Sequence, residues 1–243
     1  MSSLIIPDWP APANVRACST TRTGGFSQGP WSSFNLGAHV ADDPQHVESN
    51  RRQLCQIAGL PAMPVWLTQV HGSRVVSLPA GPEESMTADA CRTTVAGQVC
   101  AVMTADCLPV IFCSRDGRQV AAAHAGWRGL CDGVLEKTVD GFDCPPSEIL
   151  AWMGPAISQQ AFEVGPEVRD AFVAVDKAAG QAFRPRNHKF MADLWLLATQ
   201  RLNRAGVTAV SGGGRCTYQQ SEDFFSYRRE SITGRMATLV WLI

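Results

Sequence analysis

The sequence has almost no net charge and no long hydrophobic run. Its 243 residues include 21 Lys and Arg against 22 Asp and Glu, which leaves a formal net charge of −1 at pH 7. This balance gives no electrostatic indication of a nucleic-acid partner or of binding to an acidic membrane surface. The most apolar stretch, residues 99–113, is interrupted by Asp106 and Pro109 and is too short to span a bilayer.

The sequence also lacks a secretory signal and a disulfide framework. Its first twelve residues contain neither a basic stretch nor the long apolar run of a signal peptide. The nine cysteines are an odd number without a C-x-x-C pair, and Cys100, Cys107, Cys113 and Cys131 lie in apolar or helix-like segments. Reduced thiols have this distribution. We expect a cytoplasmic monomer or weak homo-oligomer without nucleic-acid or membrane partners.

What the sequence does contain is enough apolar material for one large core. Hydrophobic residues make up 45% and charged residues 18% of the chain. No fixed-period repeat and no long linker divides it. We therefore predict a single domain over residues 1–243, of α+β class, in which helices cover a mixed sheet in α/β/α-type layers.

Strand patterns are concentrated in the middle of the chain and at its end. The predicted strands end at about residue 104, span 108–113, end at about residue 123, flank His71-Gly72 within 64–78, and span 236–243. The central strands are apolar at nearly every position, so both faces of their sheet should be covered.

Helix patterns alternate with these strands. The first predicted helix follows Asp43 as its cap, has Pro44 at its first position and ends at Gly59. The other predicted helices contain Leu130, Val134, Leu135, Thr138 and Val139 at helical spacing, span 166–175, and span 192–205 before Gly206.

Three residues with metal-binding side chains follow predicted strands. His71 follows WLTQV, Cys107 follows VMTAD, and His124 follows VAAA. The ends of neighbouring strands meet at one sheet edge, where open α/β sheets bind ligands. Two histidines and one cysteine suit Zn²⁺, and three protein ligands leave a fourth position open, as in catalytic zinc sites. Such an ion would lower the pKa of a bound water toward ~7, and Asp106 could orient a ligand or that water.

The same three residues allow a second interpretation, a thiol nucleophile with its base. A cysteine beside a histidine is also the minimum for a thiol nucleophile and its base. Cys107 would then attack, His124 would take its proton, and His71 would bind or orient the substrate. The extra histidine favours the metal, because a thiol dyad needs only one.

Candidate substrate-binding residues lie in glycine-rich or aromatic motifs. Gly126-Trp127-Arg128-Gly129 should join a strand to a helix start, where backbone N–H groups and the Arg128 guanidinium could bind an anion. Arg22 in RTGG and Asn35 in SFNLG could line the wall of a pocket. Arg228 in FSYRR lies beside aromatic residues suited to stacking a ring.

Several motifs together resemble the YfiH family, also called laccase-domain proteins or peptidoglycan editing factor. The most specific are TQVHG at 68–72, TADCLPV at 104–110 and HAGWRG at 124–129. The others are TRTGG, SSFNLG, GPAI at 154–157, FEVGPEV at 162–168, RCTY at 215–218 and FFSYRR at 224–229.

The resemblance implies that His71, Cys107 and His124 bind zinc in a pocket, within a fold similar to that of a bacterial toxin with a Cys–His site. Members of the family are described as purine nucleoside phosphorylases, with adenosine deaminase and methylthioadenosine phosphorylase activities. Others are described as copper-dependent polyphenol oxidases, or are linked to the removal of peptidoglycan precursors that carry serine in place of alanine.

Chemistry ranks these activities. A multicopper oxidase needs many imidazoles, and this chain has five histidines. Zinc with an open position suits adenosine deamination, and an anion site at Arg128 suits phosphorolysis with phosphate as a small-molecule partner. We therefore predict a zinc-dependent enzyme that acts on purine nucleosides. The alternatives are a zinc or Cys–His hydrolase of peptidoglycan precursors, a copper polyphenol oxidase and a non-enzymatic metal-binding module.

Overall fold

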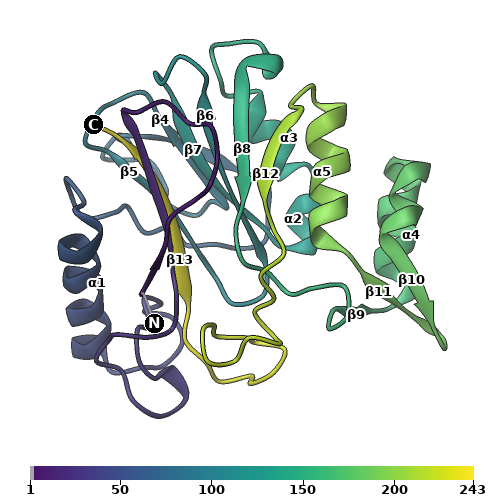
Figure 1. Cartoon of the computed structure of the whole chain (residues 1–243), viewed down its shortest axis with the longest axis horizontal. Helices are drawn as coiled ribbons and strands as arrows, with labels where there is room; N and C mark the ends of the chain where they lie inside the picture. Colours follow the sequence, from purple (N-terminus) through teal and green to yellow (C-terminus); the bar gives the residue numbers. More distant parts are fainter. Residues whose placement is uncertain (1–2) are drawn as a thin grey trace.

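Two β-sheets pack face to face in the computed structural model, which describes residues 3–243 (Figure 1). The first sheet is antiparallel and four-stranded, in the order β1-β2-β13-β5. Its strands are β1 (Leu4–Ile5), β2 (Val15–Thr20), β13 (Met236–Leu242) and β5 (Val99–Thr104). The last strand of the chain therefore pairs with two strands from its first half.

The second sheet is mixed and six-stranded, in the order β12-β8-β6-β7-β4-β3. Its strands are β12 (Ala209–Gly212), β8 (Ile149–Met153), β6 (Leu108–Ser114), β7 (Val120–Ala125), β4 (Ala90–Thr93) and β3 (Val75–Leu78). The pairs β12–β8 and β3–β4 are parallel and the others are antiparallel. A small antiparallel sheet is formed by β10 (Phe183–Arg186), β11 (Lys189–Ala192) and β9 (Glu163–Val164).

Helices cover the outer faces of the two sheets (Figure 1). The α-helices are α1 (Pro44–Ala58), α2 (Trp127–Cys131), α3 (Val134–Val139), α4 (Pro166–Val175) and α5 (Leu194–Arg204). Short 3-10 helices span Gly29–Trp31, Pro146–Glu148 and Lys177–Ala182. Leu54 of α1 packs on the four-stranded sheet, whereas side chains of α2, α3 and α5 pack on the six-stranded sheet. The predicted layered α+β fold with a mixed sheet is confirmed.

The side chains of β6 and β7 alternate between two cores. On β6, Val110 and Phe112 face the helices, whereas Ile111 and Cys113 face the other sheet. Successive side chains of a strand point to opposite faces. Every side chain of β5, β6 and β7 is buried, so the prediction that both faces of these strands are covered is confirmed.

Most predicted helix boundaries agree with the structure. Asp43 accepts a hydrogen bond from the backbone N–H of Gln45, and Gly59 ends α1 in the left-handed conformation with φ 60°. Helix α4 spans the predicted residues, and α5 begins after the cap Asp193. The helix predicted around Leu130–Val139 is two short helices, because Gly133 has φ 89° and interrupts the turn.

One predicted strand is absent. Within 64–78 only β3 is a strand, and Thr68 makes a single bridge to Thr87. The Gln69 side chain donates to the carbonyl of Met103 at 2.8 Å and accepts from its backbone N–H at 2.7 Å. The next three backbone N–H groups donate to a carboxylate, so this segment cannot form a strand ladder. No helix among the described residues is long and apolar enough to cross a membrane.

Candidate metal centre

His71, Cys107 and His124 lie together in the structure. Their candidate ligand atoms all lie within 4.8 Å of one another. The Cys107 Sγ is 3.9 Å from His71 Nε2, and the two imidazole rings are 4.8 Å apart at an interplanar angle of 73°. The sequence predicted that the three residues meet at one edge of a single sheet, but they come from different parts of the fold. Cys107 follows β5 of one sheet, His124 lies within β7 of the other, and His71 lies in a loop.

His124 faces the space between the two sheets because of its place on β7. Val120 and Ala122 point into the core between the sheets, whereas Ala121, Ala123 and Ala125 face the helices. His124 continues the first row and is buried. The small Ala121 and Ala123 let α3 pack closely on the helix side of β7, whereas Ala122 belongs to the core between the sheets.

Asp89, immediately before β4, connects both histidines. Its Oδ1 accepts from His124 Nδ1 at 2.8 Å and from the backbone N–H of His71 at 2.9 Å. Its Oδ2 accepts from the N–H groups of Val70 at 3.1 Å and Gly72 at 2.7 Å. Because Nδ1 donates to Asp89, Nε2 is the His124 atom available to a metal. The carboxylate also holds His71 at φ 60°, a conformation rare for a residue with a side chain.

Asp106 has a different role from the one expected beside Cys107. Its Oδ1 accepts from the Thr217 hydroxyl at 2.6 Å, and its Oδ2 accepts from the Arg228 backbone N–H at 2.7 Å. With φ 99°, Asp106 also turns the chain out of β5 before Cys107. It therefore ties the carboxyl-terminal loop to the site, and Asp89 is the carboxylate that orients a candidate ligand.

The two glycines of HAGWRG are required by close contacts. A Cβ on Gly126 would lie 2.9 Å from His71 Cδ2, 3.0 Å from Cys107 Sγ and 3.6 Å from His124 Cε1. A Cβ on Gly129 would lie 2.5 Å from the Gly72 carbonyl oxygen. Gly126 therefore leaves the space in which the three side chains converge, and Gly129 lets α2 pack against the backbone of the His71 loop.

Cys107 and His124 shift each other's pKa. Burial alone would raise the pKa of Cys107, but His124, and to a smaller extent His71, lower it to about 6. Burial alone would lower the pKa of His124, but Cys107 and Asp89 raise it to about 9. Burial also opposes ionisation of Asp89, yet the hydrogen bonds from His124, Gly72 and Val70 hold its pKa below the usual value. Without a metal, these shifts favour a thiolate on Cys107 beside an imidazolium on His124.

The three side chains open into a cavity of about 460 Å³. Its lining is His39, Gln69, His71, Met103, Thr104, Ala105, Cys107, His124, Arg128, Tyr227 and Arg235. Arg128 follows the cap Gly126 at the start of α2, as the sequence predicts for that segment, and its exposed guanidinium stacks on the Trp127 ring. Within residues 3–243 no hydrogen bond or ion pair engages that guanidinium, so it is available to a ligand.

The other three residues proposed from the sequence to bind substrate do not line this cavity. Arg22 donates to the carbonyls of Ser32 and Ser221 and stacks on Phe225. Asn35 is buried, and its Oδ1 accepts from the backbone N–H of Arg235, which lies immediately before β13. Arg228 donates to the Glu163 carbonyl. Their polar atoms hold loops together.

Sequence reasoning did not identify Asp89, Gln69, His39 or Arg235. Asp89 carried a usable signal, because an acidic residue in the otherwise apolar ADAC segment is expected to be buried with partners. Arg235 precedes β13, where Met236 pairs with Thr104 of β5, and this long-range pairing is invisible in local patterns.

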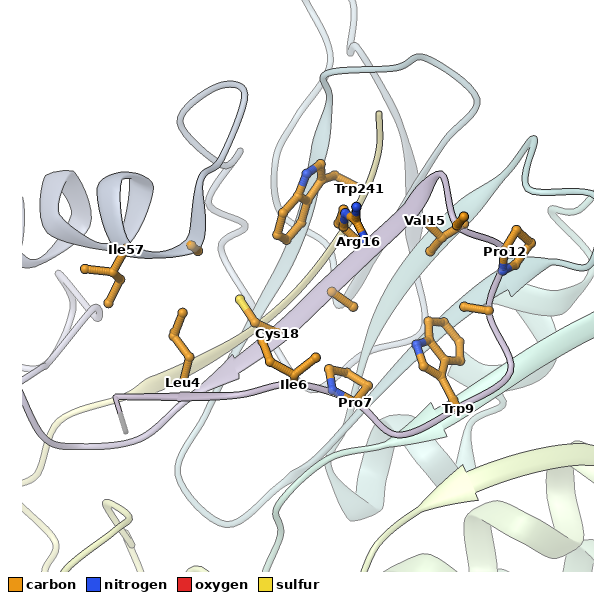
Figure 2. Close-up of a pocket in the computed structure, with 14 residues that line it drawn as sticks. Leu4, Ile6, Pro7, Trp9, Pro12, Val15, Arg16, Cys18, Ile57 and Trp241 are labelled. Carbon is orange, nitrogen blue, oxygen red and sulfur yellow. The ribbon is translucent and has the colours of Figure 1, made fainter. Parts of the chain in front are cut away.

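Another cavity, of about 400 Å³, lies between the amino-terminal segment and β2 (Figure 2). Figure 2 shows Ile6, Pro7 and Trp9 along one side of it and Cys18 on β2 opposite. Burial raises the pKa of the Cys18 thiol to about 12. This groove is mainly apolar, and within residues 3–243 the cluster of metal-binding side chains lies at His71, Cys107 and His124 instead.

The residues present fit a metal ion. The donor set is two imidazoles and one thiolate, the space between them is kept open by Gly126, and Asp89 fixes the tautomer of His124. His71, Cys107 and His124 would hold the ion. No fourth His, Cys, Asp or Glu belongs to this cluster among the described residues, which leaves a position directed to the cavity.

Comparison with known proteins gives consistent matches over nearly the whole chain. Residues 16–243 match the family described as multi-copper polyphenol oxidoreductase laccase. The purine nucleoside phosphorylase YfiH of Escherichia coli is 58% identical over 243 residues, covering 100% of both chains. The purine nucleoside phosphorylase PA4543 of Pseudomonas aeruginosa is 57% identical over 244 residues, covering 100% of this chain and 99% of that protein.

Solved structures agree with these relatives. Protein NMB0706 of Neisseria meningitidis is similar with a TM-score of 0.95 and 50% identity, and 99% of each chain is covered. The hypothetical protein YfiH of Bacillus licheniformis is similar with a TM-score of 0.90 and 28% identity, covering 100% of this chain and 97% of that one. This chain therefore belongs to the laccase-like YfiH family.

Proposed function

We propose that this chain is a zinc-dependent purine nucleoside phosphorylase that acts on adenosine, inosine and methylthioadenosine. The observation that carries the proposal is a three-residue metal centre with an open side, facing a cavity that contains the unpaired guanidinium of Arg128. The names of the Escherichia coli and Pseudomonas aeruginosa relatives support this reaction class. The cavity volume is within the range of small-molecule sites.

When bound, zinc would supply a Lewis acid at the bottom of the cavity. Phosphorolysis forms a bond between a phosphate oxygen and ribose C1′ and breaks the bond from C1′ to the base. The phosphate must therefore be held beside the ribose. Arg128 provides a planar fork of donors for this anion.

Adenosine deamination belongs to the same proposal. It requires the purine ring and a water molecule to meet in a cavity with an electrophilic centre, and the open side of the His–Cys–His cluster supports this. Asp89 would hold His124 in one tautomer throughout. Phosphorolysis and deamination would then differ in which small molecule approaches the nucleoside.

A second candidate uses Cys107 as the nucleophile of a hydrolase that edits peptidoglycan precursors. The order Cys107, His124, Asp89 is that of a nucleophile, a base and the group that orients the base. The lowered pKa of Cys107, about 6, favours a thiolate at neutral pH. In this alternative the sulfur would attack a carbonyl carbon, His124 would protonate the leaving amine, and water would then hydrolyse the resulting thioester to release the acid and restore the thiol.

Polyphenol oxidation by a multicopper centre has less support. Of the five histidines, only His71 and His124 belong to the cluster and His39 lines the cavity wall. A multicopper oxidase requires many more imidazoles than these. A purely structural metal is also disfavoured, because structural zinc usually has four protein ligands.

The proposed function is tested by incubating the zinc-loaded protein with inosine or adenosine, with and without phosphate, and separating the products by chromatography. We expect base release that depends on phosphate, together with conversion of adenosine to inosine. A Cys107→Ala variant is the control. If wild type releases no more base and deaminates no more adenosine than this variant, the phosphorylase proposal fails and the hydrolase becomes the better candidate.

A further inference from the structure

A second chamber of about 460 Å³ adjoins the metal cavity. The chamber is lined by Ala38, His39, Arg51, Trp66, Leu67, Thr68, Gln69 and Met103. His39, Gln69 and Met103 belong to the walls of both spaces. Gln69 is fixed by two hydrogen bonds to the backbone of Met103, so this shared wall is firmly held. A residue that lines both spaces, such as His39, could therefore contact a ligand larger than a nucleoside bound at the metal site.

Arg51 of α1 is held in the wall of the second chamber. Its Nε and Nη2 donate to the Leu36 carbonyl at 3.0 and 2.9 Å, and its guanidinium stacks 4.3 Å from the centre of the Trp66 ring. Its Nη1 has no partner among the described residues. The side chain is thus fixed in place while part of its donor fork remains free.

Arg235 is positioned by the same loop that holds Arg51. Its backbone N–H donates to Asn35 Oδ1 at 2.8 Å, and its carbonyl accepts from the Leu36 N–H at 3.1 Å. The side chain lies across Gly37, where a Cβ would come within 2.8 Å of Arg235 Cγ. The motif SSFNLG therefore holds Arg51 and Arg235 beside the two adjoining cavities. His39, which lines both cavities, follows two residues after Gly37.

The two adjoining cavities have three arginines in their walls. Their walls contain Arg51, Arg128, Arg235 and His39 but, among residues 3–243, no Asp or Glu. Asp106 and Glu48, whose charges act on Arg235 and Arg51, lie outside these walls. Asp106 accepts from Thr217 and from the Arg228 backbone, and Glu48 pairs with Arg52. Burial, and then the charges of Arg235 and Arg51, lower the pKa of His39, which fits a group close to both arginines.

We propose that Arg51, His39 and Arg235 form a second anion subsite, which binds a phosphomonoester carried by the purine nucleoside. The inference rests on the proposed nucleoside chemistry. Arg128 remains for the attacking phosphate beside the metal, whereas Arg235 lines the metal cavity, Arg51 lines the second chamber and His39 lines both. A phosphomonoester is an anionic group that a nucleoside can carry, and it could accept from Arg51 Nη1, which has no partner within residues 3–243. The substrate class is then extended from nucleosides to nucleoside monophosphates.

The test is a calorimetric titration of the zinc-loaded full chain with adenosine, adenosine 5′-monophosphate and inorganic phosphate. We expect the monophosphate to bind wild type roughly tenfold more tightly than adenosine, the gain typical of a charge-assisted hydrogen bond. Arg51→Gln and His39→Gln should each remove most of this gain. His39 is exposed and makes no hydrogen bond that folding requires, so its variant remains informative if Arg51→Gln is unstable. Arg16→Gln, an exposed arginine outside both cavities, should leave the gain unchanged.

Each other result overturns the subsite. Equal affinity for adenosine and its monophosphate, no binding of the monophosphate, or a gain that survives in both variants would do so. Inorganic phosphate that binds as tightly as the monophosphate, with the same loss in Arg51→Gln, would show a site for the free ion instead. A chain that binds the monophosphate through Arg51 but turns over no nucleoside would contradict the phosphorylase proposal and leave the subsite standing.

Discussion

Asp89 and His124 are joined by a 2.8 Å hydrogen bond between Oδ1 and Nδ1, and the side-chain exposures of His124 and Asp89 are 4% and 0%. The same carboxylate accepts the backbone N–H groups of Val70, His71 and Gly72. One buried side chain therefore sets the tautomer of one candidate ligand and the loop conformation of another. The geometry of the metal centre depends on Asp89 although Asp89 is not among the three candidate ligands.

We expect Asp89→Asn to weaken zinc binding roughly 10- to 100-fold, the usual cost of losing a carboxylate that orients a ligand. An amide has only one oxygen and would direct its NH₂ group at backbone donors of the His71 loop. Competition with a chelating dye measures the affinity. Asp116→Asn is the control, because Asp116 lies on the exposed turn between β6 and β7, at the opposite end of this hairpin from Cys107 and His124. Equal zinc affinity in wild type and Asp89→Asn would contradict this role.

We expect the purified protein to hold about one zinc ion per chain through three ligands. Cys107→Ala and His124→Ala should each lose the ion, because two remaining ligands bind it poorly. Elemental analysis after dialysis measures the content. Cys144→Ala removes a cysteine outside the cluster and should keep the metal. Full zinc retention by Cys107→Ala, or none in wild type, would refute the assignment.

Local patterns predicted the central strands well because these strands are apolar on both faces and bounded by turns. Strands β5 and β6 begin and end close to the predicted positions. Their placement in different sheets was not predictable, since only three residues separate them and Asp106 redirects the chain with φ 99°. The three metal-type residues were identified by residue type, but the reason for their meeting, a site between two sheets, was not.

Contacts between residues far apart in the sequence were the main feature that local patterns did not predict. Asp89 and His124 are 35 positions apart, and Asn35 and Arg235 are 200 positions apart. Neither pair leaves a periodic signal. Arg22, Asn35 and Arg228 are polar residues in glycine-rich or aromatic motifs, and such residues serve equally well to tie loops together, as their contacts with backbone groups show.

Gly126→Ala and Gly129→Ala should have different effects. The added methyl on Gly126 would meet the side chains of His71 and Cys107, so zinc binding should weaken while the melting temperature changes little. The added methyl on Gly129 would meet the Gly72 carbonyl at 2.5 Å, where backbone must move, so the fold itself should lose stability. Metal titration and thermal unfolding of both variants test this. A Gly126→Ala protein with wild-type zinc affinity would contradict the role of Gly126 in leaving space for the three ligands.

In the metal-free protein, Cys107 should be the most reactive cysteine near neutral pH. Its pKa of about 6 makes it a thiolate at pH 7, and its reaction with iodoacetamide should slow as the pH falls through 6 and the sulfur is protonated. Burial raises the pKa of Cys18 and of Cys113 to about 12, so both should stay unmodified. Peptide mapping after alkylation with chelator present identifies the sites. Zinc should protect Cys107, and equal labelling with and without zinc would contradict its role as a ligand.

Arg128→Ala should weaken the use of phosphate roughly 10- to 100-fold and leave the zinc content unchanged. The guanidinium lines the metal cavity, has no protein partner within residues 3–243 and stacks on Trp127, so its removal costs the fold little. Losing a charge-assisted hydrogen bond to an anion typically reduces affinity by about this factor. Initial rates of inosine cleavage at increasing phosphate give the apparent KM for phosphate, and Arg118→Ala, at an exposed turn, controls for the loss of one charge. If Arg128→Ala keeps the wild-type phosphate dependence, Arg128 does not bind the phosphate and the anion binds elsewhere in the cavity.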